Sequence, residues 1–276
     1  MSYATLISPA TLNQQQKRPD WVLVDCRFNL SDAAAGYHAY LNSHIPGAIY
    51  AHLDNDLSHP PTTDHGRHPL PSPEQLITLF SRLGIAANKQ VVVYDDVNGA
   101  FAARLWWMLR YMGHEAVAVL EGGWPAWVAA ALPTHTGEES PTPALFTGQP
   151  RREWLVTLDE VPHQPLLVDS RDAARYRGEM ETIDPVAGHI PGAVNYHFGR
   201  NMTADGQFLP PEQVREQLLQ VLGETRPQQA VFYCGSGVSA CLNLLALKHA
   251  GLPDGKLYVG SWSEWCADPS RPVAAN

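Results

Sequence analysis

The chain contains the same series of sequence landmarks twice. HIPGA occurs at residues 44–48 and again, 145 residues later, at 189–193. Three other landmarks accompany HIPGA in each half, and the four occur in the same order in both halves. These are LVDCR, VVVYDD and EGGWPAW in the first half, and LVDSR, AVFYCG and GSWSEW in the second. One shared pentapeptide would mean little, but four ordered matches predict a duplicated structural unit.

Each half alternates short apolar runs with segments of helical periodicity. Runs that are apolar throughout are typical of strands buried on both faces of a parallel sheet. The expected strands are 21–24, 91–94, 166–168 and 230–233. The expected helices are 73–83, 100–112, 211–222 and 238–250. The pattern predicts the α/β class, with two tandem domains that each hold a parallel sheet flanked by helices.

The predicted boundaries follow from chain length and from one composition change. A chain of 276 residues suits two domains of ordinary size. Residues 136–152 are rich in Pro, Gly, Ser and Thr, which is typical of a linker. We therefore expect an N-terminal domain at 1–135, which has no catalytic cysteine, and a C-terminal catalytic domain at 153–276.

Composition excludes several classes of function. The net charge of −9 disfavours non-specific nucleic-acid binding. No apolar run approaches the roughly 20 residues that span a bilayer, and the N-terminus lacks a secretory signal pattern. The four cysteines are too few for a disulfide scaffold and show no metal-ligand spacing. We expect a cytoplasmic protein that binds neither membrane nor nucleic acid and holds no metal or cofactor.

The second half places a cysteine between a predicted strand and a predicted helix. Two glycines in this loop allow tight backbone angles, so that successive N–H groups can form an anion-binding nest. The helix dipole that follows also favours a thiolate. The matching position in the first half is Asp95, which cannot accept sulfur. The loop consists of Cys234, Gly235, Ser236, Gly237, Val238, Ser239 and Ala240.

An isolated cysteine after an apolar strand is more often a small core residue. The Gly-Ser-Gly sequence that follows Cys234 argues against that interpretation for this cysteine. Cys26, Cys241 and Cys266 have no such context, and we interpret them as structural.

The motifs CGSGVSA, HIPGA, VDSR and GSWSEW together resemble the rhodanese superfamily in its tandem-domain form. The resemblance covers nearly the whole chain. Within the superfamily, the CGSG loop resembles that of the 3-mercaptopyruvate sulfurtransferases. Members that prefer thiosulfate typically carry basic residues just after the cysteine, and this loop has none.

The resemblance also implies partners for Cys234. In the mercaptopyruvate enzymes a Ser two residues after the cysteine acts with an Asp and a His, which match Ser236, Asp54 and His68 here. The Asp alone could also cap a turn, and the His could be one of several surface histidines.

Arg175 matches an arginine that binds the carboxylate of the donor. A second arginine of the family has no match, because Asp184 stands at its position and only Arg177 offers a substitute nearby.

The leading hypothesis is therefore a sulfurtransferase that carries sulfur as a persulfide on Cys234. Its donor would be a small sulfur-containing anion, 3-mercaptopyruvate or alternatively thiosulfate. A thiol, a thioredoxin-like protein or cyanide would accept the sulfur. A cysteine-dependent phosphatase needs an arginine six residues after the cysteine, where Ala240 stands. A non-catalytic binding module is a further alternative, and Asp95 suits it for the first half.

Overall fold

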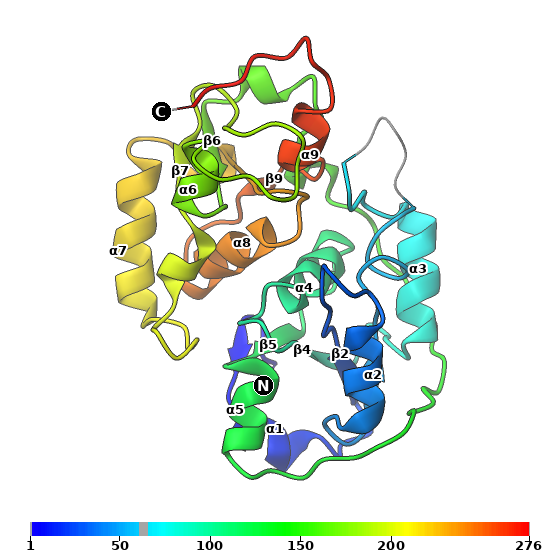
Figure 1. Ribbon diagram of the computed structural model, residues 1–276. Coiled ribbons are helices and arrows are strands. Elements are labelled where there is room, and N and C mark those ends of the chain that lie inside the picture. Colours follow the sequence, from blue (N-terminus) through cyan, green and yellow to red (C-terminus); the bar gives the residue numbers. More distant parts are fainter. Residues whose placement is uncertain (1, 61–65, 276) are drawn as a thin grey trace. The chain divides into compact units, whose positions relative to one another are not determined.

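The computed structural model describes residues 2–60 and 66–275 (Figure 1). The chain divides into two compact units. The first unit comprises residues 1–59, 71–151 and 204–207, and the second comprises 60–70, 152–203 and 208–276. None of the described helices is long and apolar enough to cross a membrane.

The first unit is built on a parallel five-stranded sheet in the order β1-β5-β4-β2-β3. Its strands are β1 (Leu6–Ile7), β2 (Trp21–Asp25), β3 (Ala48–Tyr50), β4 (Gln90–Tyr94) and β5 (Val117–Leu120). Its helices are α1 (Pro9–Gln15), α2 (Ala35–Asn42), α3 (Pro73–Arg82), α4 (Ala102–Tyr111) and α5 (Gly123–Ala129). Every residue of β4 and of α4 is buried, including Arg104 and Arg110 of the helix.

The second unit is built on a parallel four-stranded sheet in the order β7-β6-β8-β9. Its strands are β6 (Leu166–Asp169), β7 (Val194–Asn195), β8 (Ala230–Tyr233) and β9 (Lys256–Leu257). Its α-helices are α6 (Ala173–Tyr176), α7 (Pro211–Leu222), α8 (Ala240–His249) and α9 (Ser261–Trp265). Its 3-10 helices are η1 (Arg152–Trp154), η2 (Val161–His163), η3 (Phe198–Asn201) and η4 (Pro227–Gln229).

The two units repeat the same buried ion pair. Arg27 bonds the Asp25 carboxylate at 2.7 Å, and Arg171 bonds the Asp169 carboxylate at 2.7 Å. Each guanidinium also lies over a tryptophan ring, Trp124 in the first unit (4.6 Å) and Trp262 in the second (4.9 Å). Removing one partner would leave an uncompensated buried charge, which typically costs about 3–5 kcal/mol. These residues serve the fold, as their occurrence in both halves indicates.

The predicted α/β class is confirmed, with helices packed on two parallel sheets. The expected strands and helices are all present, with ends that differ by at most two residues from the sequence pattern. Residues 66–70, although early in the chain, pack with the second unit. The boundaries 1–135, 136–152 and 153–276 stay a prediction, because each compact unit is made of several separate segments of the chain.

Candidate active site

The loop that follows β8 is anchored by its carbonyl groups. The carbonyl oxygens of Cys234 and Gly235 accept hydrogen bonds from the N–H groups of Trp262 (3.0 Å) and Ser263 (2.9 Å). Gly237 has φ +73°, and a Cβ there would lie 2.2 Å from the carbonyl oxygen of Val259. Only glycine fits such a position, and the turn that it makes directs the following N–H groups back toward the cysteine.

Cys234 is surrounded by donors although its side chain is almost fully buried, with 2% exposed. Burial acts to raise the pKa of the thiol, because a low dielectric disfavours the thiolate. The Ser239 hydroxyl and the N–H groups of Ser236, Ala240 and Gly237 outweigh that effect and hold the pKa of Cys234 below its ordinary value. The predicted amide nest is therefore present, and it favours the thiolate.

The matching loop of the first unit holds a carboxylate in the same kind of nest. The Asp95 carboxylate accepts hydrogen bonds from the N–H groups of Val97 (2.9 Å), Gly99, Phe101 and Ala102 (each 2.8 Å). One backbone angle matches as well, since Asn98 has φ +60° at the position where the second unit has Gly237, with φ +73°. The first unit thus keeps the anion-binding loop and fills it with its own side chain.

Ser236 and His68 form a pair within the second unit. His68 Nδ1 and Ser236 Oγ lie 2.7 Å apart, and both side chains are buried. Residues 66–70, which belong to the second unit, bring the histidine to the cysteine loop. The expected contact between these two residues is confirmed, while their catalytic role stays a prediction.

Asp54 belongs to the first unit, in the segment after β3. Its backbone N–H donates to His52 Nδ1 at 3.1 Å, and its side chain is half-buried. Its membership of a triad with His68 and Ser236 stays a prediction.

Arg175 lies beside the cysteine loop, as the sequence indicates. A Cβ on Gly235 would be 3.6 Å from its Nη1. The opposite edge of the guanidinium is held by Glu181, which accepts from Nε (3.1 Å) and Nη2 (2.8 Å), and by Asp184 (3.1 Å). Within the described residues, Nη1 of Arg175 donates no hydrogen bond, so it is available to a ligand.

Arg67 is a charged residue beside the cysteine loop that sequence reasoning missed. It forms an ion pair with Asp184, and a Cβ on Gly235 would lie 2.9 Å from its Nη2. Burial lowers the pKa of Arg67, and the negative charge of Cys234 acts in the opposite direction. Arg177, considered as a substitute for the missing arginine, instead bonds Glu179 at the surface. The sequence signal for Arg67 was Asp184, which stands where the family has its second arginine. A carboxylate at that position needs a positively charged partner, and Arg67 provides it.

The comparison with family models decides the classification. The rhodanese-like domain model matches residues 8–130 and again 152–268. The chain belongs to the rhodanese family of sulfurtransferases.

The names of relatives of this chain include both candidate donors, 3-mercaptopyruvate and thiosulfate. It is 47% identical, over 99% of either chain, to a probable 3-mercaptopyruvate sulfurtransferase of Pseudomonas aeruginosa. It is 41% identical to a putative thiosulfate sulfurtransferase of Mycobacterium tuberculosis, over 91% of this chain and 89% of that one. The structure of the 3-mercaptopyruvate sulfurtransferase from Leishmania major aligns with a TM-score of 0.85 at 33% identity, covering 95% of this chain and 74% of that one.

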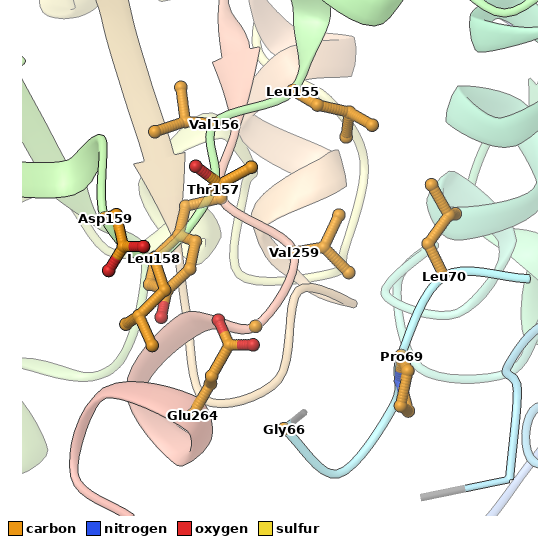
Figure 2. A pocket seen from close by; sticks show the side chains of 12 residues that line it. Gly66, Pro69, Leu70, Leu155, Val156, Thr157, Leu158, Asp159, Val259 and Glu264 are labelled. Atoms are coloured by element: carbon orange, nitrogen blue, oxygen red, sulfur yellow. The ribbon is translucent and has the colours of Figure 1, made fainter. Parts of the chain in front are cut away.

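A cavity of about 410 Å³ lies in the second unit of this rhodanese (Figure 2). Pro69 and Leu70 line one side of it, and Val259 and Glu264 line another. Among the described residues, its lining includes neither Cys234 nor Arg175. The cavity therefore neighbours the 66–70 segment without containing the reactive sulfur.

Proposed function

We propose that the protein transfers sulfane sulfur from 3-mercaptopyruvate to a thiol or cyanide acceptor through a persulfide on Cys234. The observation that carries the proposal is the Cys234 side chain, which lies in a ring of inward-facing donors that favours its anion. A thiolate is the nucleophilic form of cysteine. The Ser236–His68 pair beside it supplies a route for a proton.

In the first half-reaction the Cys234 thiolate attacks the sulfur of the donor. A sulfur–sulfur bond forms as the carbon–sulfur bond of the donor breaks, and the bonding electrons leave on carbon as the enolate of pyruvate. The terminal sulfur of the resulting persulfide is also anionic at neutral pH. The amides of the loop can stabilise that anion as they stabilise the thiolate.

The enolate needs a proton to become pyruvate. Ser236 Oγ can deliver it, because the hydroxyl stands within hydrogen-bond distance of His68 Nδ1 and can be reprotonated by the imidazole. Asp54 would set the tautomer of His68 in this scheme. The proton is most needed with a carbon leaving group, so the pair favours 3-mercaptopyruvate as the donor.

The donor carboxylate would bind between two arginines. Nη1 of Arg175 and Nη2 of Arg67 both lie close to Gly235. Glu181 and Asp184 hold the other edges of these guanidiniums, so both groups are fixed before a ligand arrives. Preorganised guanidiniums suit a planar carboxylate.

In the second half-reaction an acceptor attacks the terminal sulfur and Cys234 leaves again as a thiolate. Small thiols, a thioredoxin-like protein and cyanide all have the required nucleophile. Two separate half-reactions predict ping-pong kinetics. The scheme requires no metal or organic cofactor. The four free cysteines support a reducing compartment, and we propose the cytoplasm.

Thiosulfate is the second candidate donor. The loop itself carries no basic side chain, but Arg67 places a second positive charge beside Gly235. Two cations at the loop suit a dianion as well as a carboxylate. Specificity constants for both donors, measured on the same preparation, decide between the two.

The mass of the intact protein after treatment with donor tests the persulfide. We expect a gain of one sulfur atom in the wild type and in Cys241→Ser, which changes another buried cysteine. The gain should be lost in Cys234→Ser and on addition of cyanide. A mass gain that persists in Cys234→Ser would overturn the proposal, and so would its absence from the wild type with both donors.

A further inference from the structure

Three side chains with metal-binding atoms meet in the first unit. They are His44 of the first HIPGA motif, and His135 and Glu139 of the segment that follows α5. One nitrogen or oxygen atom from each lies within 4.8 Å of the other two. The repeat explains the position of His44 but not the other two residues.

His44 presents a lone pair toward this cluster. Its Nδ1 lies 2.8 Å from the carbonyl oxygen of Tyr40. A carbonyl can only accept, so Nδ1 carries a proton, and Nε2 is the ring nitrogen that can ligate a metal. The His44 side chain is fully buried, and its Nε2 has no hydrogen-bond partner. That atom faces Glu139, with Oε1 3.7 Å away.

The second unit has the equivalent histidine, His189, at the same turn. His189 Nδ1 lies 2.7 Å from the carbonyl oxygen of Tyr176, which repeats the bond of His44. His44 pairs by backbone bonds with His135, and His189 pairs in the same way with Ala274. The turn therefore needs only the histidine, and the second imidazole is an addition of the first unit.

Glu139 is fixed in place by bonds that leave its carboxylate beside both imidazoles. Its backbone N–H donates to the Tyr40 hydroxyl at 2.9 Å, and its Oε1 accepts from the N–H of Gly47 at 3.0 Å. His135 Nδ1 lies 2.9 Å from the same oxygen. These contacts tie the start of the segment after α5 to the turn after α2.

We propose that His44, His135 and Glu139 bind a zinc ion. Two imidazoles and one carboxylate form a common donor set for zinc, with bonds of about 2.0–2.2 Å. Ligand atoms around a tetrahedral ion at such distances lie about 3.3–3.6 Å apart, so the present separations require only small side-chain shifts. His135 is 56% exposed, which leaves the fourth position open to water.

Binding displaces one proton. His135 donates its Nδ1 proton to Glu139 in the present arrangement, since a carboxylate accepts. Zinc takes the place of that proton between the two side chains, and the neutral imidazole of His135 then carries its proton on Nε2. The ion then crosslinks the turn after α2 to the segment after α5, and it needs no group from the cysteine loop.

Zinc titration of the full-length Cys234→Ser variant tests the proposal. That background removes the thiolate, which would itself bind the metal. Calorimetry should show one bound ion, and cobalt should give the visible spectrum of a low-coordinate site. His135→Ala and Glu139→Gln should each weaken binding at least about tenfold. His163→Ala, which changes an exposed histidine of the second unit, should leave binding unchanged.

Zinc should also raise the thermal midpoint of the Cys234→Ser protein, and the rise should vanish when His135→Ala is added. His135 is exposed, so its replacement does not endanger folding. Absence of stoichiometric binding overturns the proposal, as does equal zinc affinity with and without His135→Ala. Sulfur transfer is not read in either assay, so the result is independent of the proposed reaction.

Discussion

Cys234 and Asp95 stand at the same position of two matching loops, and each has a side chain that can carry a negative charge. Inward-facing amides hold each of them, and the Ser239 hydroxyl adds a further donor to the thiolate. Reactivity thus depends on one atom, because sulfur can accept sulfur and a carboxylate oxygen cannot. The loop supplies a general anion site, and the residue at its first position decides its chemistry.

The lowered pKa of Cys234 predicts how fast iodoacetamide alkylates it at different pH. The thiolate reacts, so the rate should rise with pH and level off at a midpoint below that of an ordinary cysteine. Ser239→Ala removes a hydrogen bond that lowers the pKa, and the midpoint should move upward. Burial raises the pKa of Cys26 and Cys266, which should stay unmodified. Ser31→Ala, at an exposed turn, is the control; identical profiles for the wild type and Ser239→Ala would contradict the prediction.

The two arginines at Gly235 predict a binding defect when Arg67 is replaced. Arg67→Ala should raise KM for 3-mercaptopyruvate about tenfold or more, because one charge-assisted contact to the carboxylate is lost. The rate at saturating donor should change less. Arg177→Ala is the matched control, since that residue pairs with Glu179 at the surface. Steady-state kinetics with both variants check this, and equal KM values would remove Arg67 from donor binding.

At the scale of elements, the strand–loop–helix unit is what the sequence predicts best. The strand carries a continuous apolar run, the helix shows helical periodicity and the glycines mark the turn, so β8, the loop and α8 follow from pattern alone. The position of Arg67 does not follow from any pattern. It depends on residues 66–70 packing with the second unit, and that contact joins residues far apart in the chain. Local periodicity holds no information on such a contact.

Asp95→Asn tests the loop between β4 and α4 as a structural element. Each carboxylate oxygen accepts two amide N–H groups, and an asparagine would point its NH₂ group at two of these donors. We expect a loss of about 3 kcal/mol or more in the free energy of unfolding. Urea unfolding of the variant measures it, with Asp32→Asn at an exposed turn as the control. A loss below 1 kcal/mol, on the order of one ordinary neutral hydrogen bond, would mean that the nest does not depend on the charge.

At the scale of the whole molecule, the candidate site residues are distributed unevenly between the two units. The second unit holds Cys234, Ser236, His68 and both arginines. The first unit holds Asp54 and a loop that cannot carry sulfur. The landmark repeat predicted that only the second unit has a cysteine in this loop, whereas chain order placed His68 in the first domain and the structure groups it with the second unit. The role of Asp54 rests on resemblance alone.

Asp54→Ala shows whether the first unit takes part in turnover. Without a carboxylate to set the tautomer of His68, kcat with 3-mercaptopyruvate should fall about 100-fold, within the range of general acid–base effects. The fall with thiosulfate should be smaller, because no carbanion awaits a proton. Asn55→Ala, at the next residue, should behave as wild type. Unchanged turnover in folded Asp54→Ala would limit the first unit to a structural role.

The two matching loops differ in what they hold during turnover. During each catalytic cycle the second loop must hold first one sulfur atom and then two, so its amides adjust to an anion that changes in size. Asp95 gives the first loop a permanent occupant that never changes. The amides of the first loop therefore keep the same four hydrogen bonds whatever the loop of the second unit holds.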